Sequence, residues 1–96
     1  MILNFANKLA EDFFDDRVTK VTRSFPPELR RLSRRKLQYL HEAVDLNDLK
    51  VPPGNKLEAL KGDKTGFYSI RINDQWRLVF RFQQGNALDV SIIDYH

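Results

Sequence analysis

Cysteine is absent from this chain of 96 residues, and histidine occurs only twice, at His41 and His96. Without cysteine the chain can form neither a disulfide bond nor a thiolate metal site. The two histidines lie far apart in the sequence, which argues against a zinc site. We therefore expect a protein that works without a metal ion or another cofactor.

Long apolar runs are also missing, because no segment approaches the length that spans a membrane. The N-terminus lacks a basic segment followed by a long apolar one, so we expect no secretion signal. The sequence contains no repeat, linker or low-complexity tract. These absences predict one soluble, cytoplasmic domain over residues 1–96, near the lower size limit for a chain that builds its own core.

Charge is distributed unevenly along the chain, although the net charge is only +3. Residues 17–36 carry eight basic side chains against Glu28 alone, whereas residues 1–16 and 37–49 are each net acidic. A local excess of +7 fits an anionic partner such as nucleic acid or an acidic protein. A solvated helix face explains the same pattern about as well, and charge alone does not choose between them.

The first 24 residues predict a short strand, a helix and a loop. Residues 1–5 form a short apolar segment, which is typical of a first strand. Asn7 or Asn4 is suited to cap a brief helix that runs to Phe14. The polar residues 15–24 then predict a loop.

A second helix is predicted from Pro26-Pro27, because proline and the acidic Glu28 both favour a first helical turn. We expect this helix to end near Asp45. Its apolar face has one polar interruption, Lys36, and consists of Leu29, Leu32, Lys36, Leu37, Leu40, Ala43 and Val44.

Beyond a Pro-Pro-Gly segment the hydrophobic period changes to two, which predicts strands over residues 67–72, 76–82 and 88–93. Asn73-Asp74 is a plausible two-residue hairpin turn between the first two of them. Helices followed by a three-strand meander predict an α+β fold. We expect a small antiparallel sheet, including the N-terminal strand, with two helices packed on one face.

The strand period assigns side chains to the two faces of this sheet. The core-facing set is apolar and consists of Ile70, Ile72, Trp76, Leu78, Phe80 and Phe82. Arg77 and Arg81 must then point away from the helices, as must Ser69 and Arg71. Arg71 and Arg77 flank the tight turn, so we expect them to lie close together on the open face.

Two neighbouring arginines repel each other unless an anion lies between them. A phosphate clamp is one interpretation, because guanidinium groups match phosphate oxygens. The alternative is that the arginines pair with Asp74, Asp89 or the C-terminal carboxylate. Spacing alone does not choose between these interpretations.

The chain ends with Asp94-Tyr95-His96, and all three side chains are able to move protons. In the strand before them we expect Leu88, Val90 and Ile92 to face the core, which turns Asp89, Ser91 and Ile93 outward. Tyr95 then lies on the arginine face. Strict alternation sends Asp94 and His96 to the opposite side, so Tyr95 and His96 need not share a pocket.

Lys56 and Lys61 precede the sheet and are candidates for contact with an RNA backbone. Glu58 lies between them and is either a base or a charge partner. Lys64-Thr65 lacks the glycine pattern of a phosphate-binding P-loop, which excludes nucleotide hydrolysis. His41 lies mid-helix among apolar residues, where a structural or surface histidine is expected rather than a catalytic one.

One family is similar to this sequence in three places: residues 57–62 (Leu-Glu-Ala-Leu-Lys-Gly), residues 68–78 (Tyr-Ser-Ile-Arg-Ile-Asn-Asp-Gln-Trp-Arg-Leu) and the terminal Asp94-Tyr95-His96. Together they resemble HigB-type toxins of the RelE superfamily. The motifs cover residues 50–96 closely, and the helical half agrees in length and order.

The resemblance implies a toxin of a type II toxin-antitoxin system, with a RelE-like α+β fold. Such toxins are metal-independent endoribonucleases that cut mRNA on the ribosome by 2′-hydroxyl attack on the adjacent phosphate. The implied partners are the ribosome, mRNA and a cognate helix-turn-helix antitoxin of the HigA type. Operator DNA would be bound only through that antitoxin, and no membrane is involved.

The resemblance also implies roles for individual residues. His96 and Asp94 are the acid/base candidates, Tyr95 orients or stacks on the substrate, and Arg77 and Arg71 stabilise the phosphorane. The RNA-binding candidates are basic residues, namely Lys56, Lys61, Arg81, Arg30 and Arg34.

Glu58 departs from members of the family that carry an active-site histidine at this position. A carboxylate there repels phosphate and does not readily donate a proton at neutral pH. We therefore expect a weak or moderate toxin in which His96 carries more of the proton transfer. The alternative is a ribosome- or RNA-binding translation inhibitor, or a degenerate toxin, that does not cleave and mainly serves as an antitoxin partner.

Overall fold

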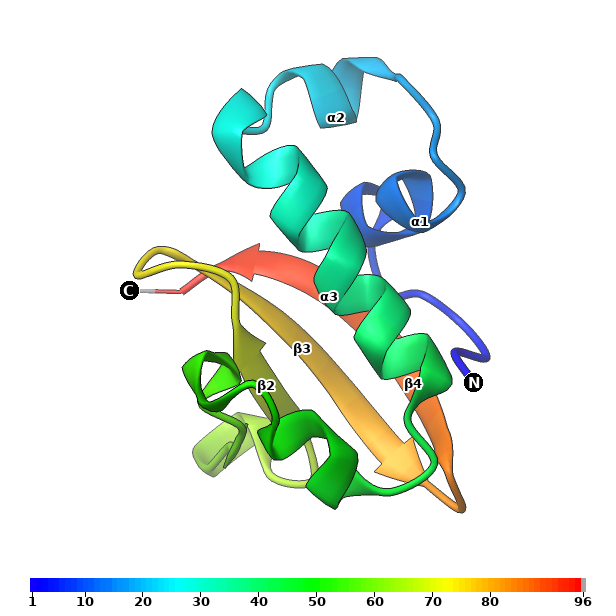
Figure 1. Cartoon of the computed structure of the whole chain (residues 1–96), viewed down its shortest axis with the longest axis vertical. Coiled ribbons are helices and arrows are strands. Elements are labelled where there is room, and N and C mark those ends of the chain that lie inside the picture. The colour runs from blue at the N-terminus through cyan, green and yellow to red at the C-terminus, as the bar shows by residue number, and fades with distance from the viewer. Residues whose placement is uncertain (96) are drawn as a thin grey trace.

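The computed structural model describes residues 1–95 as a four-stranded antiparallel sheet with helices against one face (Figure 1). The strands follow the spatial order β1-β2-β3-β4 and comprise β1 (Glu58–Ala59), β2 (Tyr68–Arg71), β3 (Trp76–Gln83) and β4 (Asn86–Asp94). The α-helices are α1 (Lys8–Phe14), α2 (Lys20–Arg23) and α3 (Arg30–Glu42). The 3-10 turns are η1 (Pro27–Leu29), η2 (Leu46–Lys50), η3 (Pro53–Asn55) and η4 (Gly62–Lys64). The predicted α+β fold is confirmed.

The helical layer is built on α1 and α3, which pack against each other and against β4. In Figure 1, α3 crosses the face of the sheet. Its buried side chains meet the fully buried Ile70, Leu78 and Phe80 of the strands in one core. No helix in residues 1–95 has the length and apolar character needed to cross a membrane.

The predicted N-terminal strand is reduced to two isolated bridges. Ile2 pairs with Ala87 and Phe5 pairs with Val90, both in the parallel sense. Residues 1–5 therefore lie along the free edge of β4 without forming a regular strand. His41 supports this segment, because its Nδ1 accepts the backbone N–H of Ile2 at 3.1 Å. The structural role expected for His41 fits this contact.

The predicted cap of α1 is confirmed at Asn7, whose side chain accepts the backbone N–H of Ala10 at 3.1 Å. The predicted loop over residues 15–24 is wrong, since it contains the one-turn helix α2. Thr19 and Thr22 cap each other's backbone N–H groups at its start. Such a reciprocal cap stabilises a single helical turn. One turn is too short to show a hydrophobic periodicity in the sequence.

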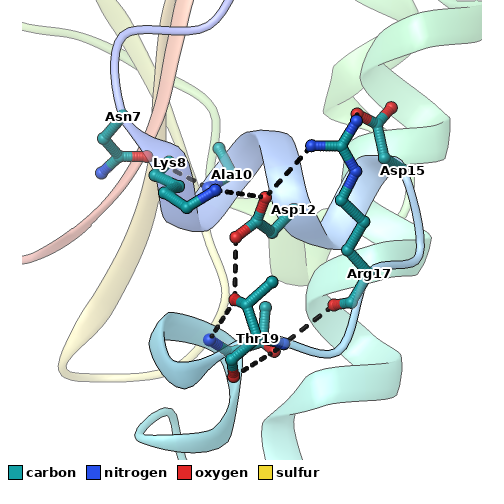
Figure 2. Close-up of polar contacts among 8 residues, drawn as sticks. Asn7, Lys8, Ala10, Asp12, Asp15, Arg17 and Thr19 are labelled. Carbon is teal, nitrogen blue, oxygen red and sulfur yellow. Dashed lines mark hydrogen bonds and ion pairs between the residues drawn. The ribbon is translucent and has the colours of Figure 1, made fainter.

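A buried acid holds α2 against α1. Asp12 is fully buried, and its carboxylate accepts the hydroxyl of Thr19 at 2.8 Å and the ammonium group of Lys8 at 3.2 Å. Figure 2 shows this carboxylate between Lys8, Thr19 and the guanidinium of Arg17, which lies 3.9 Å away. Burial raises the pKa of Asp12, but the hydrogen bonds from Thr19 and Lys8 and the nearby cations outweigh it and lower that pKa below its usual value.

The second predicted helix begins as η1 and continues as α3, which ends at Glu42 rather than near Asp45. The helix stops there because the side chain of Asp48 accepts the backbone N–H groups of Val44 and Asp45. Val44 is 76% exposed, so the prediction that it belongs to the apolar face of the helix is wrong.

Lys36 is buried within the apolar face of α3, with 6% of its surface exposed. Its ammonium group donates a hydrogen bond to the side-chain oxygen of Asn55, which is itself fully buried in η3. Burial, followed by the charges of Arg71 and Arg35, lowers the pKa of Lys36. The polar interruption of the helix face therefore ties α3 to the loop before β1.

The last strand contains a bulge that the sequence pattern did not predict. The pairing of β3 with β4 shifts between Val79 and Arg81, and Asp89 adopts a left-handed backbone conformation with φ of 52°. Leu88 consequently pairs with Arg81 and turns away from the core, while Ala87 takes the buried position. The prediction that Leu88 faces the core is therefore wrong.

The turn between β2 and β3 is longer than the predicted two residues. β2 ends at Arg71 and β3 begins at Trp76, which leaves residues 72–75 in the connection. The side chain of Asn73 accepts the backbone N–H groups of Gln75 and Trp76 at 3.0 and 2.7 Å. This side-chain turn fixes the geometry of the hairpin.

Candidate functional site

The candidate site lies on the face of the sheet opposite the helices. Two rows of side chains cross this face because directly paired residues point the same way. The first row contains Glu58, Ser69, Val79 and Ser91 from the four strands in order. The second row contains Arg71, Arg77 and Ile93. The predicted proximity of Arg71 and Arg77 is confirmed, since their Cα atoms are direct partners across the hairpin.

Each arginine of this face has a carboxylate partner. Nη2 of Arg71 lies 2.5 Å from Oδ1 of Asp74, and Nη1 of Arg77 lies 3.7 Å from Oε1 of Glu58. The internal ion pairs left open by the sequence are therefore present, although the partner of Arg77 is Glu58 on β1. An anion that binds these guanidinium groups must compete with both carboxylates.

Arg81 lies apart from these two arginines. Its guanidinium contacts Asp89 at 3.1 Å, and the same carboxylate accepts the side-chain N–H of Asn4 at 2.7 Å. Four residues along a strand separate Arg81 from Arg77, which corresponds to about 13 Å. These hydrogen bonds lower the pKa of Asp89. Asp89 therefore stays charged, and paired with Arg81, at pH values where an ordinary carboxyl group begins to be protonated.

Tyr95 lies against Arg77, on the predicted face. The guanidinium carbon of Arg77 is 5.5 Å from the centroid of the tyrosine ring, within the range of a cation–π contact. Only 18% of the Arg77 side chain is exposed, because Glu58 and Tyr95 contact its guanidinium. Arg77 therefore joins β1, β3 and the end of the chain in one cluster.

The β2–β3 turn positions the C-terminal residues (Figure 1). The carbonyl of Gln75 accepts the backbone N–H of Tyr95 at 2.6 Å, and the Gln75 side chain donates to Asp94 at 3.0 Å. Asp94 pairs with Trp76 in the register of the sheet, so it lies on the side away from Tyr95, as strict alternation requires. His96 lies outside the described residues.

Ser69 and Val79 correct the expectation of an open, solvated face. Ser69 is fully buried and Val79 is 2% exposed, although both point away from the helices. Leu60, which follows β1, is also buried at 7% exposure. This small buried set gives the arginine cluster a partly desolvated floor, where ionic contacts are stronger than in water.

The pKa of Asp74 reflects the positive charge around it. Its pKa is lowered by the hydrogen bond from Arg71, by the charge of that guanidinium, and by the charges of Lys56 and Arg77. Lys56 therefore belongs to the same cationic neighbourhood as the two arginines. Lys61 is exposed two residues after the end of β1.

Two further RNA-binding candidates lie on the helical side of the sheet. Arg34 contacts Asp16 at 3.3 Å, and Arg30 donates to the backbone oxygen of Arg23 at 3.2 Å. Both extend from α3 and are separate from the arginine cluster. Candidate RNA-binding cations therefore lie on both layers of the fold.

Sequence reasoning did not identify Gln75 as a contact of the chain end, nor the floor position of Ser69. The signal for Gln75 was its place in the hairpin turn, but the contact requires knowledge of where β4 ends. In residues 1–95 no three His, Asp or Glu side chains gather as a set of metal ligands.

Comparison with known proteins shows to which family the chain belongs. Residues 3–96 match the family described as a RelE-like toxin of the type II toxin-antitoxin system HigB. The whole chain is 40% identical to Toxin HigB-1 of Vibrio cholerae and covers 98% of it. It is 32% identical to Endoribonuclease HigB of Proteus vulgaris, with 100% of both chains covered.

Solved structures support the fold. The chain is similar to the YoeB-YefM complex from Staphylococcus aureus, with a TM-score of 0.63 and 24% identity over 100% of this chain and 95% of that chain. For the YoeB dimer from the same organism the TM-score is 0.57, with 24% identity over 99% and 92% of the two chains. The family match and both HigB relatives span the full chain, so the protein belongs to the HigB-like family of RelE-like toxins from type II toxin-antitoxin systems.

Proposed function

We propose that this toxin is a metal-independent endoribonuclease that cuts mRNA on the ribosome and so inhibits translation. The observation that carries the proposal is the cluster around Arg77, with Glu58 on one side, Tyr95 on the other and Arg71 directly opposite. A relative of 32% identity, the Proteus vulgaris protein, is named an endoribonuclease. The proposed partners are the ribosome, mRNA and a HigA-like antitoxin that mediates any contact with operator DNA.

The proposed reaction transfers a phosphoryl group within the RNA. A base removes the proton of the ribose 2′-hydroxyl, and the resulting oxygen attacks the adjacent phosphorus. The bond from phosphorus to the 5′-oxygen breaks as an acid protonates that oxygen. The products are a 2′,3′-cyclic phosphate and a 5′-hydroxyl, and negative charge accumulates on the phosphorane between the two steps.

Arg77 is the proposed contact for the phosphorane, because its guanidinium is partly desolvated and its planar fork matches phosphate oxygens. Arg71 adds a second cation from the neighbouring strand once Asp74 yields its place. Tyr95 stacks on or orients the nucleotide next to Arg77. His96 and Asp94 are the proposed acid/base candidates, with neither role assigned to one of them, and His96 is expected to carry more of the proton transfer.

Glu58 limits the activity in this proposal. Its carboxylate occupies Arg77 and repels an incoming phosphate, so we expect weak or moderate cleavage. The same ion pair favours a second candidate function, a toxin that binds the ribosome or RNA and blocks translation without cutting. With either function, the toxin would still bind its antitoxin.

The deciding experiment maps mRNA 5′ ends in a translating extract given antitoxin-free protein, alongside the same mRNA without ribosomes. Codon-phased cuts that appear only during translation support the nuclease. Arrested synthesis with intact mRNA supports the non-cutting inhibitor. Cuts in free mRNA would contradict the proposed ribosome dependence.

Two variants test the residue roles in that extract. His96→Ala should abolish cleavage, whereas Glu58→Ala should change it only modestly, because Glu58 is assigned to charge competition rather than proton transfer. Full cleavage by His96→Ala would show that the assignment of His96 is wrong.

A further inference from the structure

The Arg77–Glu58 ion pair must pass over β2. The sheet order places β2 between the strands that carry these two residues, and Ser69 is the direct partner of Glu58 on β2. Arg71, two residues along β2, is the direct partner of Arg77. To bring its guanidinium within 3.7 Å of Glu58, the Arg77 side chain extends diagonally across the segment between Ser69 and Arg71.

Ser69 lies on this face with an unused hydroxyl. It is fully buried, and its Oγ has no hydrogen-bond partner among residues 1–95. The Nε of Arg77 is also buried without a partner in the described part of the chain. The two polar groups come from diagonal positions on the same face of neighbouring strands. Leaving both unsatisfied costs free energy, which a bound acceptor would recover.

We propose that Ser69 and Arg77 form one anion-binding site for an RNA phosphate, which the Glu58 carboxylate occupies in the free protein. As an RNA site it rests on the proposed function, and it adds Ser69 as a phosphate-binding residue. When Glu58 swings aside, the Ser69 hydroxyl becomes accessible and donates to the same oxygen-rich ligand that the guanidinium binds. One carboxylate oxygen of Glu58 lies 3.7 Å from Nη1 of Arg77, so the carboxylate holds a place that a phosphate oxygen would also suit.

A structural explanation of Ser69 makes a different prediction. A small residue on β2 leaves room for the Arg77 side chain to cross, and an alanine would serve equally well. Only a binding role requires the hydroxyl. The two explanations separate in the affinity for phosphate, not in the stability of the fold.

The test is an NMR titration of the full chain with inorganic phosphate, which follows the side-chain Nε–H signal of Arg77. Glu58→Gln should bind phosphate several-fold more tightly than the unmodified chain, because the neutral amide competes less. In that background, Ser69→Ala should weaken binding about tenfold, as expected for loss of a hydrogen bond to a charged group. Ser69→Cys preserves the size but has a weak donor, so it should weaken binding similarly.

Ser33 supplies the matched control. Its hydroxyl is also fully buried without a partner in residues 1–95, but it lies in α3 on the helical side. Ser33→Ala should leave phosphate affinity unchanged. If Ser69→Ala also leaves it unchanged, or if phosphate does not shift the Arg77 signal in Glu58→Gln, the proposal is wrong even for a protein that cuts mRNA. Ser69-dependent phosphate binding without mRNA cleavage would keep this site and reject the nuclease.

Discussion

The backbone N–H of Tyr95 donates a hydrogen bond of 2.6 Å to the carbonyl of Gln75, which ties the end of the chain to the β2–β3 turn. The Gln75 side chain adds a second tie by donating to Asp94 at 3.0 Å. Chain ends ordinarily fray unless such contacts hold them. The turn thus places Tyr95 against Arg77, and the proposed chemistry depends on that placement.

Gln75→Ala should lower the rate of mRNA cleavage about three- to tenfold without unfolding the protein, because one of the two ties is lost. Gln38→Ala is the matched control, since Gln38 also donates its amide to a carboxylate, Glu42, at 2.9 Å on an exposed surface. Rates measured at saturating ribosomes should separate the two variants. Equal activity of both would show that the side-chain tie does not position the chain end.

Asp74→Asn should increase RNA affinity about two- to fivefold at low salt, because Arg71 loses the carboxylate that neutralises it. The gain should shrink as salt is added. Asp63→Asn makes the same change at an exposed aspartate of η4 that forms no ion pair in residues 1–95. A similar gain in both variants would indicate a general charge effect, and Arg71 would then have no special part in it.

Arg77→Lys should reduce cleavage about a hundredfold, because a lysine retains the charge but lacks the planar fork and the stacking surface for Tyr95. Arg81→Lys on the same strand is the control, since Arg81 lies about 13 Å along β3 from Arg77 and its guanidinium contacts Asp89 rather than Glu58 and Tyr95. We expect this second change to cost less than about threefold. Comparable losses in single-turnover assays would argue against a distinct role for Arg77.

Acid should destabilise the link between α1 and α2 through Asp12. Its folded-state pKa is lowered, so its contribution to stability is present above the unfolded value of about 3.9 and is lost as the pH falls through the folded value. Urea unfolding between pH 3 and 6 should therefore show a steeper loss of stability in the unmodified chain than in Asp12→Asn.

The same variant should also melt at a lower temperature near neutral pH, by about 5 to 10 °C, because a buried charged acceptor is replaced by an amide. Asp15→Asn is the control, as Asp15 pairs with Arg17 at 3.4 Å but is considerably exposed. If Asp15→Asn flattens the acid profile as much as Asp12→Asn, the buried network is not its source.

Local patterns predicted the elements of this protein well where a single segment carried enough signal. Asn7 preceded an apolar period and capped α1 as expected, and the alternation around Trp76 assigned Arg77 to the correct face. α2 was missed because one turn is too short for periodicity. Leu88 was misassigned because a bulge at Asp89 changes the alternation, and nothing in the flanking residues marks it.

Patterns within short segments were enough to predict the α+β class, the amphipathic helix α3 and the meeting of Arg71 with Arg77, since each depends on residues close together in the chain. The carboxylate that meets Arg77 could be identified only in the folded chain, whereas the partner of Arg71 lies three residues away in the same turn. The Arg77–Glu58 pair and the burial of Ser69 depend on β1 lying beside β2, and the contact of Gln75 with Tyr95 depends on where β4 ends. Strand order and register are set by the packing of the whole core, which no local pattern encodes.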